Sequence, residues 1–388
     1  MNSLSSNPYK IAYLVTVPMV AKVFLSHQIC TLSKMYRVTL ITNLKEQGDL
    51  LNWVPDNVEV IDMPISREIN LISDLKVLFL LIKLFYKSNF SLVHSVSPKA
   101  GLLAMLASFM TQVPVRLHTF TGQVWVTKHG IGKRLLRWLD RLINSLATIV
   151  LIDSRSQQDF LIENKVVKKT SSIVLGEGSI SGVDLDRFRV DPIARKQIRL
   201  DLETPDNAIV FLFLGRIKKE KGILELADAF SRVHQKYRNT ELWIVGPDED
   251  SLHYILEEIT GIHLIPFTTS PEKYMAASDV LCLPSHREGF GSVIIEAGAC
   301  GIPSIGSNIY GLNDAIVDGE TGILIPLKLV NELESAMGLL VNDRKLRQKM
   351  GKAACKRSAS KFSQDILTEQ LVDLYKDLLK GHTHKALG

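Results

Sequence analysis

The chain has 388 residues, of which 46% are hydrophobic and 22% are charged, and it carries a net charge of +5. These proportions exclude an intrinsically disordered protein, and the length exceeds what one ordinary core holds, so we expect two domains. Residues 1–180 hold 20 Lys and Arg against 12 Asp and Glu, and residues 181–388 hold 26 against 29, so the halves either face different partners or differ by drift of surface charge.

The cysteines and the most apolar segment exclude further classes of protein. The four cysteines form no CxxC pair, and two lie in apolar runs, so we expect free thiols in a reducing cytoplasm and neither disulfides nor a zinc site. The N-terminal residues lack the pattern of a signal peptide. Residues 72–86 are strongly apolar, but Asp74, Lys76 and Lys83 interrupt them, which predicts a buried or surface-lying helix and no membrane span.

Short apolar runs alternate with helical periodicity along the chain, as in buried parallel strands joined by helices. In the first half, strands are predicted at 10–15, 37–42, 58–61, 92–96, 115–118 and 148–152, and helices at 21–35, 71–88, 99–112, 132–146 and 154–165. After a Gly- and Ser-rich linker at 175–188, strands are predicted at 209–214, 242–245, 262–265 and 280–283, and helices at 222–237, 249–260, 292–300, 328–341 and 343–360. This order predicts two doubly wound α/β domains, in which ligands bind outside the carboxyl ends of the strands.

Residues 128–146 of the first domain are both basic and amphipathic. Lys133, Arg134, Arg137 and Arg141 alternate there with leucines and a tryptophan. Such a helix either packs one face in the core and exposes a solvated basic face, or lies on an anionic membrane surface. Both interpretations stay open, and the second agrees with the positive charge of the first half.

The first strand of the second domain is followed by a short basic loop. Gly215 ends the strand, and Arg216 and Lys221 flank the loop before a helix that opens at Gly222. Arginine binds phosphate oxygens in a fork, and lysine contributes a point charge. A run of charges alone usually marks a solvated face, but Arg216 directly after a buried strand favours an anion site.

Two glutamates flank the start of a later helix in the same domain. Glu288 lies in the loop after the strand at 280–283, and Glu296 lies about one turn inside the helix at 292–300. Glycines in this loop permit close backbone approach, and free amides at the helix start bind anions. Either glutamate alone is more often an exposed or paired residue, but together they are suited to the hydroxyls on both sides of a diphosphate, as in a nucleotide sugar.

The motif G-R-x4-K-G, followed about 70 residues later by E-x7-E, resembles the donor site of the retaining glycosyltransferases of family 4. GVDLDRF (182–188) and DGETGILIP (318–326) are similar to further segments of that family. The resemblance implies the α/β fold called GT-B, with two Rossmann-like domains that face each other across a cleft. It places an acceptor-side domain at 1–182, a donor-binding domain at 183–365, and a C-terminal helix at 366–388 that packs back on the first domain.

The resemblance also implies roles for individual residues of the second domain. Arg216 and Lys221 would bind the donor diphosphate, Glu288 would contact the sugar as a catalytic residue, and Glu296 would bind the ribose hydroxyls. The other donor-binding residues would be Phe267, Gly289, Phe290, Gly291, Ser292 and Val293.

In the first domain the resemblance singles out His118, at the carboxyl end of a predicted strand. An isolated histidine is more often structural, but this one matches the family's histidine near the donor sugar and is predicted to be catalytic. On the acceptor side we expect Lys99, Thr121 and Gln123. The loop at 16–25 has no glycine, although many members of the family have a glycine pair there.

TFTGQVW (119–125) and HSVSPKAGLL (94–103) are similar to the branch of the family that builds bacterial O-antigens, lipopolysaccharide, capsules and exopolysaccharides. They imply a cytoplasmic enzyme, peripheral on the inner face of the membrane, that moves a hexosyl or N-acetylhexosaminyl group from a UDP-sugar to a saccharide on polyprenyl diphosphate. We expect no cofactor and no metal, because Arg216 and Lys221 already supply positive charge and the D-x-D at 184–186 lies in the linker. No nucleic-acid partner is expected.

Two other functions of the same fold remain open, a nucleotide-sugar epimerase and a non-catalytic nucleotide-sugar-binding protein. An assay of the donor without acceptor distinguishes the epimerase from the transferase. A dinucleotide-dependent dehydrogenase is disfavoured, because no G-x-G-x-x-G follows any predicted strand.

Overall fold

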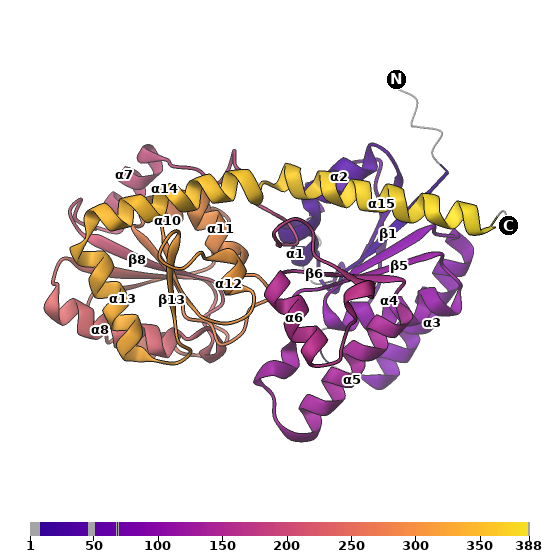
Figure 1. Ribbon diagram of the computed structural model, residues 1–388, viewed down its shortest axis with the longest axis horizontal. Helices are drawn as coiled ribbons and strands as arrows, with labels where there is room; N and C mark the ends of the chain where they lie inside the picture. The colour runs from indigo at the N-terminus through magenta and orange to yellow at the C-terminus, as the bar shows by residue number, and fades with distance from the viewer. Residues whose placement is uncertain (1–7, 46–50, 67, 69, 387–388) are drawn as a thin grey trace. The chain divides into compact units, whose positions relative to one another are not determined.

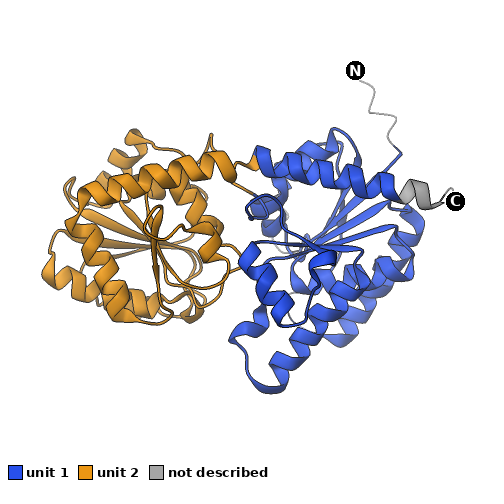
Figure 2. Cartoon of the chain, in the orientation of Figure 1, with its two compact units in different colours: residues 1–181, 365–388 blue, residues 182–364 orange. Residues whose placement is uncertain are grey.

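The computed structural model describes residues 8–45, 51–66, 68 and 70–386 (Figure 1). They form two compact units (Figure 2): unit 1 contains residues 1–181 and 365–388, and unit 2 contains residues 182–364. The long C-terminal helix α15 (Gln364–Ala386) therefore belongs to unit 1, apart from its first residue.

Unit 1 is built on a seven-stranded sheet with the order β3-β2-β1-β4-β5-β6-β7, in which every pair of neighbouring strands is parallel. Its strands are β1 (Lys10–Leu14), β2 (Arg37–Thr42), β3 (Glu59–Asp62), β4 (Leu92–Val96), β5 (Val115–Phe120), β6 (Ile149–Ile152) and β7 (Ser172–Ile173). The sequence predicts all of these except the two-residue β7. Because the chain builds the sheet outward in both directions from β1 and β4, the topological switch point lies between these two strands.

Helices cover both faces of this sheet. They are α1 (Pro18–Val20), α2 (Ser26–Ser33), α3 (Leu71–Ser88), α4 (Pro98–Met110), α5 (Gly130–Leu146) and α6 (Arg155–Glu163), with a π-helical turn at Ala21–Leu25 and 3-10 turns at Val124–Thr127 and Lys169–Ser171. Helix α4 packs between α3 and α5 (Figure 1), and one apolar core lies under this layer. A second core joins the opposite face of the sheet to α2 and α15.

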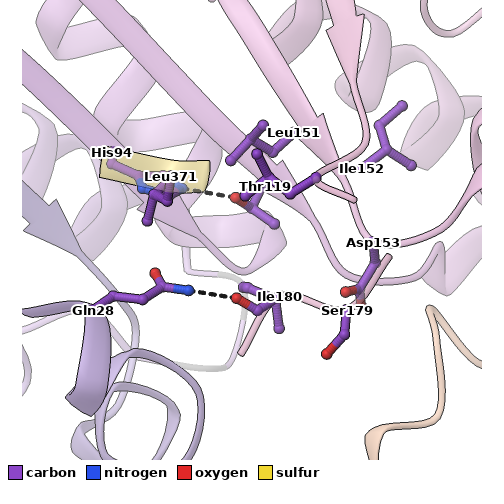
Figure 3. Close-up of a pocket in the computed structure, with 10 residues that line it drawn as sticks. Gln28, His94, Thr119, Leu151, Ile152, Asp153, Ser179, Ile180 and Leu371 are labelled. Atoms are coloured by element: carbon purple, nitrogen blue, oxygen red, sulfur yellow. Dashed lines mark hydrogen bonds between the residues drawn. The ribbon is translucent and has the colours of Figure 1, made fainter. Parts of the chain in front are cut away.

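A buried polar network attaches α15 to the sheet of unit 1. His94 Nδ1 lies 2.6 Å from the hydroxyl of Tyr375 on α15, which in turn donates to the hydroxyl of Tyr13 at 2.9 Å. The other ring nitrogen of His94 lies 2.7 Å from Thr119 Oγ1, and both residues line a small pocket with Gln28 (Figure 3). Burial, together with His118, lowers the pKa of His94 to about 3, so this network is neutral at pH 7.

Unit 2 is built on six parallel strands in the order β10-β9-β8-β11-β12-β13. The strands are β8 (Ile209–Leu214), β9 (Thr240–Val245), β10 (Ile262–Ile265), β11 (Val280–Leu283), β12 (Ser304–Ser307) and β13 (Gly322–Ile325). The helices are α7 (Pro192–Asp201), α8 (Ile223–Lys236), α9 (His253–Leu256), α10 (Pro271–Ala277), α11 (Ser292–Ala299), α12 (Leu312–Ala315), α13 (Val330–Asn342) and α14 (Arg344–Lys361), with a 3-10 turn at Lys219–Lys221. The switch point of this sheet lies between β8 and β11.

Unit 2 differs from the predicted elements in several places. The helix predicted at 249–260 is only the four-residue α9, and the predictions omit α7, α10, α12 and β12, while β13 lies in the segment 318–326 that only the family resemblance marks. Helix α7 is fixed by tertiary contacts, since the buried Arg199 donates to the carbonyl of Ala277 and to Asp279. Part of the predicted linker also belongs to the fold of unit 2, because the amide of Val183 donates to the carbonyl of Phe362 at 2.7 Å.

Across the described residues, none of the helices combines the length and the hydropathy needed to cross a membrane.

Candidate functional site

The loops that follow β8 and β11 meet at the switch point of unit 2. The amide of His286 donates to the carbonyl of Glu220 at 2.9 Å. Gly222 has φ of 70°, and a Cβ atom built on it would lie 2.0 Å from the carbonyl oxygen of Pro284. A side chain at this position would therefore push the two loops apart, and glycine is required both by the backbone angle and by the close contact.

Lys221 and Glu288, which the sequence places in one donor site, are in direct contact. Lys221 Nζ lies 2.5 Å from Glu288 Oε1, and both side chains are mostly buried. The structure thus brings together two residues that are 67 positions apart in the sequence. In the absence of a ligand, the cation and the carboxylate neutralise each other.

Arg216, at the end of β8, is paired with a carboxylate that the sequence analysis missed. Its guanidinium lies 3.1 Å from Glu249 Oε2, and Lys218 Nζ lies 3.0 Å from the same oxygen. Partial burial favours a higher pKa for Glu249, but Lys218 and Arg216 outweigh it and leave this pKa lowered. Glu249 stays ionised and holds both cations at the mouth of the loop.

The start of α11 has the backbone shape that the glycine pattern predicts. Gly291 precedes the helix with φ of 82°, and a Cβ atom on Gly311 would lie 2.4 Å from the carbonyl oxygen of Gly289. Ser292 and Val293, the first residues of the helix, are partly exposed. Phe290 differs from the expectation of a donor contact, because its ring is buried against Phe362 in the core, so at most its backbone faces the loop.

Glu296 lies on α11, which packs against α10, and is accompanied by an ion pair. Burial raises the pKa of Glu296 to about 7, the nearby Arg187 opposes this rise, and the Glu272 carboxylate adds to it. Arg187 pairs with Glu272 at 2.9 Å and also donates to the carbonyl of Thr269. Phe267, in the same loop after β10, exposes more than half of its side chain.

The D-x-D of the linker is used locally. Asp184 Oδ1 accepts the backbone amides of Asp186 at 3.1 Å and of Arg187 at 3.2 Å. Asp184 therefore has a structural role in this turn.

In unit 1, the side chain of His118, which the sequence predicts to be catalytic, is buried. Its Nδ1 lies 2.9 Å from Ser95 Oγ, and its ring packs edge-on against Phe120. A Cβ atom on Gly101 would lie 2.3 Å from the ring, so helix α4 sits directly on it. Burial lowers the pKa of His118 to about 3 and keeps the ring neutral. The ring therefore packs within unit 1, and the catalytic role of His118 stays a prediction.

The three residues expected on the acceptor side have different surroundings. Thr121, the first residue after β5, is partly exposed. Lys99 is occupied within unit 1, since its Nζ lies 2.6 Å from Asp74 Oδ1 and 3.2 Å from Ser66 Oγ. Gln123 is buried and accepts a hydrogen bond from Gln157 at 3.0 Å. Thr121 and Lys99 are thus both partly exposed, whereas Gln123 is buried, and a contact of any of them with an acceptor stays a prediction.

The basic helix α5 is exposed over part of its surface, and its four cations are not equivalent. Arg141 donates to the carbonyls of Asn164 and Lys165 at 2.9 Å, and Arg137 lies 3.5 Å from the Asn164 side chain. These two residues hold α5 to the end of α6. Arg134 is exposed beside the exposed side chains of Leu135 and Trp138.

The supporting residues around the donor loops also escaped the sequence analysis. His286 Nε2 lies 2.8 Å from Glu225 on α8, and Arg287 pairs with Glu220 at 3.1 Å. They hold the loop that carries Glu288 against the loop that carries Lys221. The local sequence signal for such residues is weak, because a charged residue near a strand end does not specify its partner.

Comparison with known proteins covers both units. Residues 194–357 match the family model described as glycosyl transferases group 1, and residues 22–176 match the glycosyl transferase 4-like domain. The chain is 33% identical over 326 residues to the capsular polysaccharide biosynthesis glycosyltransferase CapM of Staphylococcus aureus, covering 82% of this chain and 85% of that protein.

Two further proteins are similar over nearly the full length. One is the Escherichia coli UDP-Gal:alpha-D-GlcNAc-diphosphoundecaprenol alpha-1,3-galactosyltransferase, with 28% identity, 95% of this chain and 97% of that protein. The other is the crystal structure of Anabaena HepE in complex with UDP and glucose, which superposes with a TM-score of 0.79 at 18% identity and covers 95% of this chain and all of HepE. The likeness to HepE shows the GT-B fold.

Proposed function

This chain belongs to the family 4-like glycosyltransferases, and we propose that it is a retaining enzyme that transfers a sugar from a UDP-sugar to a saccharide on polyprenyl diphosphate. The contact between Lys221 and Glu288 carries the proposal. It unites a group that binds phosphate with a group that accepts hydrogen bonds from sugar hydroxyls, at the edge of the sheet where ligands of this fold bind. The product would enter a bacterial surface polysaccharide.

Donor binding exchanges the partners of the paired side chains. The diphosphate replaces Glu288 at Lys221 and Glu249 at Arg216, and the partly exposed start of α11 supplies helix N-terminal amides to the phosphates. Glu288 is then free to accept hydrogen bonds from the sugar. The ion pairs of the unliganded site thus hold both cations in place until the diphosphate binds.

The nucleoside occupies the side of α11 that faces α10. Glu296 accepts hydrogen bonds from the ribose hydroxyls, for which it must be ionised. Phe267 offers an exposed ring on which the base stacks. The identity of UDP is supported by the name of the Escherichia coli relative, which uses UDP-galactose.

The transfer proceeds on the face of the sugar that the leaving group occupies. The acceptor oxygen forms a bond to the anomeric carbon while the bond to the diphosphate oxygen breaks, and a phosphate oxygen takes the acceptor proton. Arg216 and Lys221 stabilise the charge that develops on the diphosphate. Glu288 positions the sugar, so catalysis rests on orientation and on electrostatic stabilisation of the leaving group.

The acceptor and the membrane belong to unit 1. The Escherichia coli relative is named for a GlcNAc-diphosphoundecaprenol acceptor, which lies in a membrane through its lipid chain. The net charge of +8 in residues 1–180 and the exposed Arg134 of α5 support association with the inner face of an anionic membrane. Thr121 and Lys99 are the partly exposed residues of the predicted acceptor side.

A transfer assay tests the proposal. The intact protein is incubated with UDP-sugars of several hexoses and N-acetylhexosamines, with and without a saccharide diphosphate that carries a short polyprenyl chain, and product stereochemistry is read by NMR. We expect a glycoside with the anomeric configuration of the donor, formed only with acceptor. An inverted product contradicts retention, altered donor without acceptor indicates an epimerase, and binding without turnover indicates a sugar-binding protein.

A further inference from the structure

Helix α3 of unit 1 exposes an unusual number of large apolar side chains. Leu71, Ile72, Leu75, Phe79 and Tyr86 are between 65% and 83% exposed. The opposite face of the same helix is anchored, since Val77, Leu81 and Phe85 are buried in the core under the layer of α3, α4 and α5 (Figure 1). The exposed residues are therefore not needed for packing within unit 1, and a contiguous apolar surface of this kind marks an interaction site.

The exposed apolar residues form one stripe, and three lysines border it. At about 100° of rotation per residue, the five apolar side chains fall within an arc of about 100°. Lys76, Lys83 and Lys87, all exposed, occupy the next arc of about 60° on one side. We call this surface, formed by the five apolar residues and the three lysines, the α3 face.

The charge of the α3 face has one sign. Asp74 is the only acidic residue of the helix, and Lys99 neutralises it at 2.6 Å. Lys99 is the residue that the sequence places on the acceptor side. Because it neutralises Asp74, the three lysines that border the stripe give the α3 face a net positive charge. An apolar stripe bordered by cations is complementary to a bilayer with anionic headgroups and is a poor match for a basic or neutral protein surface.

We propose that the α3 face docks on an anionic phospholipid bilayer, with the apolar stripe in the headgroup boundary and the lysines on lipid phosphates. Helix α5 extends this surface, because it belongs to the same helical layer and exposes Ile131, Leu135 and Trp138. The inference deepens the proposed function, on which it rests for the lipid-linked acceptor. It assigns the main membrane contact to α3, whereas the basic sequence pattern points to α5 alone.

Vesicle co-sedimentation of the intact protein tests the α3 face. We expect binding to vesicles of phosphatidylcholine with phosphatidylglycerol and little binding to phosphatidylcholine alone. Replacement of Lys76, Lys83 and Lys87 by serine should weaken binding about fivefold for each lysine, with a smaller effect at high salt. The double variant L75S/F79S should lose at least about tenfold on the same vesicles.

Exposed apolar residues of unit 2 provide a matched control. I193S/L200S alters two exposed side chains of α7 and should leave vesicle binding unchanged. L75S/F79S should keep its circular dichroism spectrum and its transfer to a short-chain, water-soluble acceptor, so a failure of docking is separable from a failure of the proposed transferase activity. Equal binding of L75S/F79S and the unmodified chain would overturn the proposal. So would a dimer in sedimentation velocity that L75S/F79S converts to monomer, since a second copy would then cover the α3 face.

Discussion

The two units share one sheet topology but differ in the chemistry of their switch points. Between β8 and β11 of unit 2, the loops bring together Arg216, Lys221 and Glu288 with their charged partners. Between β1 and β4 of unit 1, the corresponding loops are joined by hydroxyls, with Thr16 Oγ1 2.8 Å from Ser97 Oγ. Both sheets thus have a position for a ligand at the switch point, but the side chains at the strand ends decide whether a polyanion binds there.

The buried titratable groups differ between the units in the same way. Unit 1 buries His94 and His118 completely, whereas every histidine of unit 2, whose residues are all described, keeps part of its surface exposed. Each unit also holds a carboxyl group whose pKa burial raises, Asp140 in unit 1 to about 6 and Glu296 in unit 2 to about 7. The two buried histidines of unit 1 thus have no counterpart in unit 2, and the following predictions use this difference.

Acid should destabilise unit 1 first. Burial lowers the pKa of His94 and His118 to about 3, so below pH 6.5 the unfolded chain binds protons that the folded unit does not. Stability from these groups is present above pH 6.5 and is lost as the pH falls. Each histidine should lower the protection of core amides in unit 1 about tenfold per pH unit below 6.5, measured by hydrogen exchange and mass spectrometry.

The control for this prediction is internal. Amides in the core of unit 2 should lose less protection over the same pH range, and H94N/H118N should flatten the profile of unit 1 if it folds. Equal loss in both units, or an unchanged slope in a folded double variant, would contradict the assignment of the acid sensitivity to these histidines.

Removal of either cation of the donor loop should weaken UDP binding. Hydrogen bonds between charged groups contribute about 1.5–3 kcal/mol, so R216A and K221A should each raise the Kd for UDP roughly 10- to 100-fold in calorimetry. K218A is a matched control, because Lys218 shares Glu249 with Arg216 but is not assigned to the diphosphate. Unchanged affinity for UDP in both R216A and K221A would show that the diphosphate does not bind at this loop.

Substitutions of the two glutamates should affect different parts of the donor, Glu296 the nucleoside and Glu288 the sugar. E296Q should weaken UDP and UDP-sugar alike, by about tenfold for a hydrogen bond to a charged group. E288Q should reduce turnover while leaving the affinity for bare UDP intact or improved, because it frees Lys221 from its carboxylate partner. The reverse pattern in calorimetry and transfer assays would exchange the two roles.

UDP binding should also depend on pH through Glu296. Its pKa is raised to about 7, and the ribose requires the ionised form, so affinity should increase about tenfold between pH 6 and pH 8. The raised pKa also means that the unliganded folded state holds this proton more tightly than the unfolded chain, so stability from this group declines as the pH rises towards 7. In E296Q, the affinity for UDP should no longer increase between pH 6 and pH 8. If it still increases as in the unmodified protein, a group other than Glu296 causes the pH dependence.

The fold follows from the sequence more completely than the site does. Continuous apolar runs such as 209–214 predict the buried strands because a parallel sheet is covered on both faces, and long periodic segments such as α3 predict their helices. Strand β12 escapes prediction because SIGS has little apolar periodicity and is buried only by its neighbours. Tertiary contact, not local preference, fixes such elements.

In the site, spacing predicts which loops carry charge but not what each side chain touches. The meeting of Lys221 and Glu288 follows from strand ends that share one edge of the sheet, since β8 and β11 are neighbours. The burial of His118 does not follow, because a histidine at a strand's carboxyl end has the same local sequence whether it points at a ligand or beneath α4. Only the packing of Gly101 on its ring distinguishes the two.

The smallest expected effect concerns metal ions. Arg216 and Lys221 supply two positive charges where the leaving diphosphate develops negative charge, which is the stabilisation that a divalent cation gives in other phosphate-transfer sites. Transfer by the intact protein should therefore be unchanged by EDTA and not restored or increased by Mg²⁺ or Mn²⁺. In K221A, where one of these charges is missing, Mg²⁺ should recover part of the lost turnover if charge alone is at issue. If EDTA abolishes the activity of the unmodified protein and Mg²⁺ restores it, the two side chains do not suffice to stabilise the leaving diphosphate. A bound cation would then be a further difference between the switch point of unit 2 and that of unit 1.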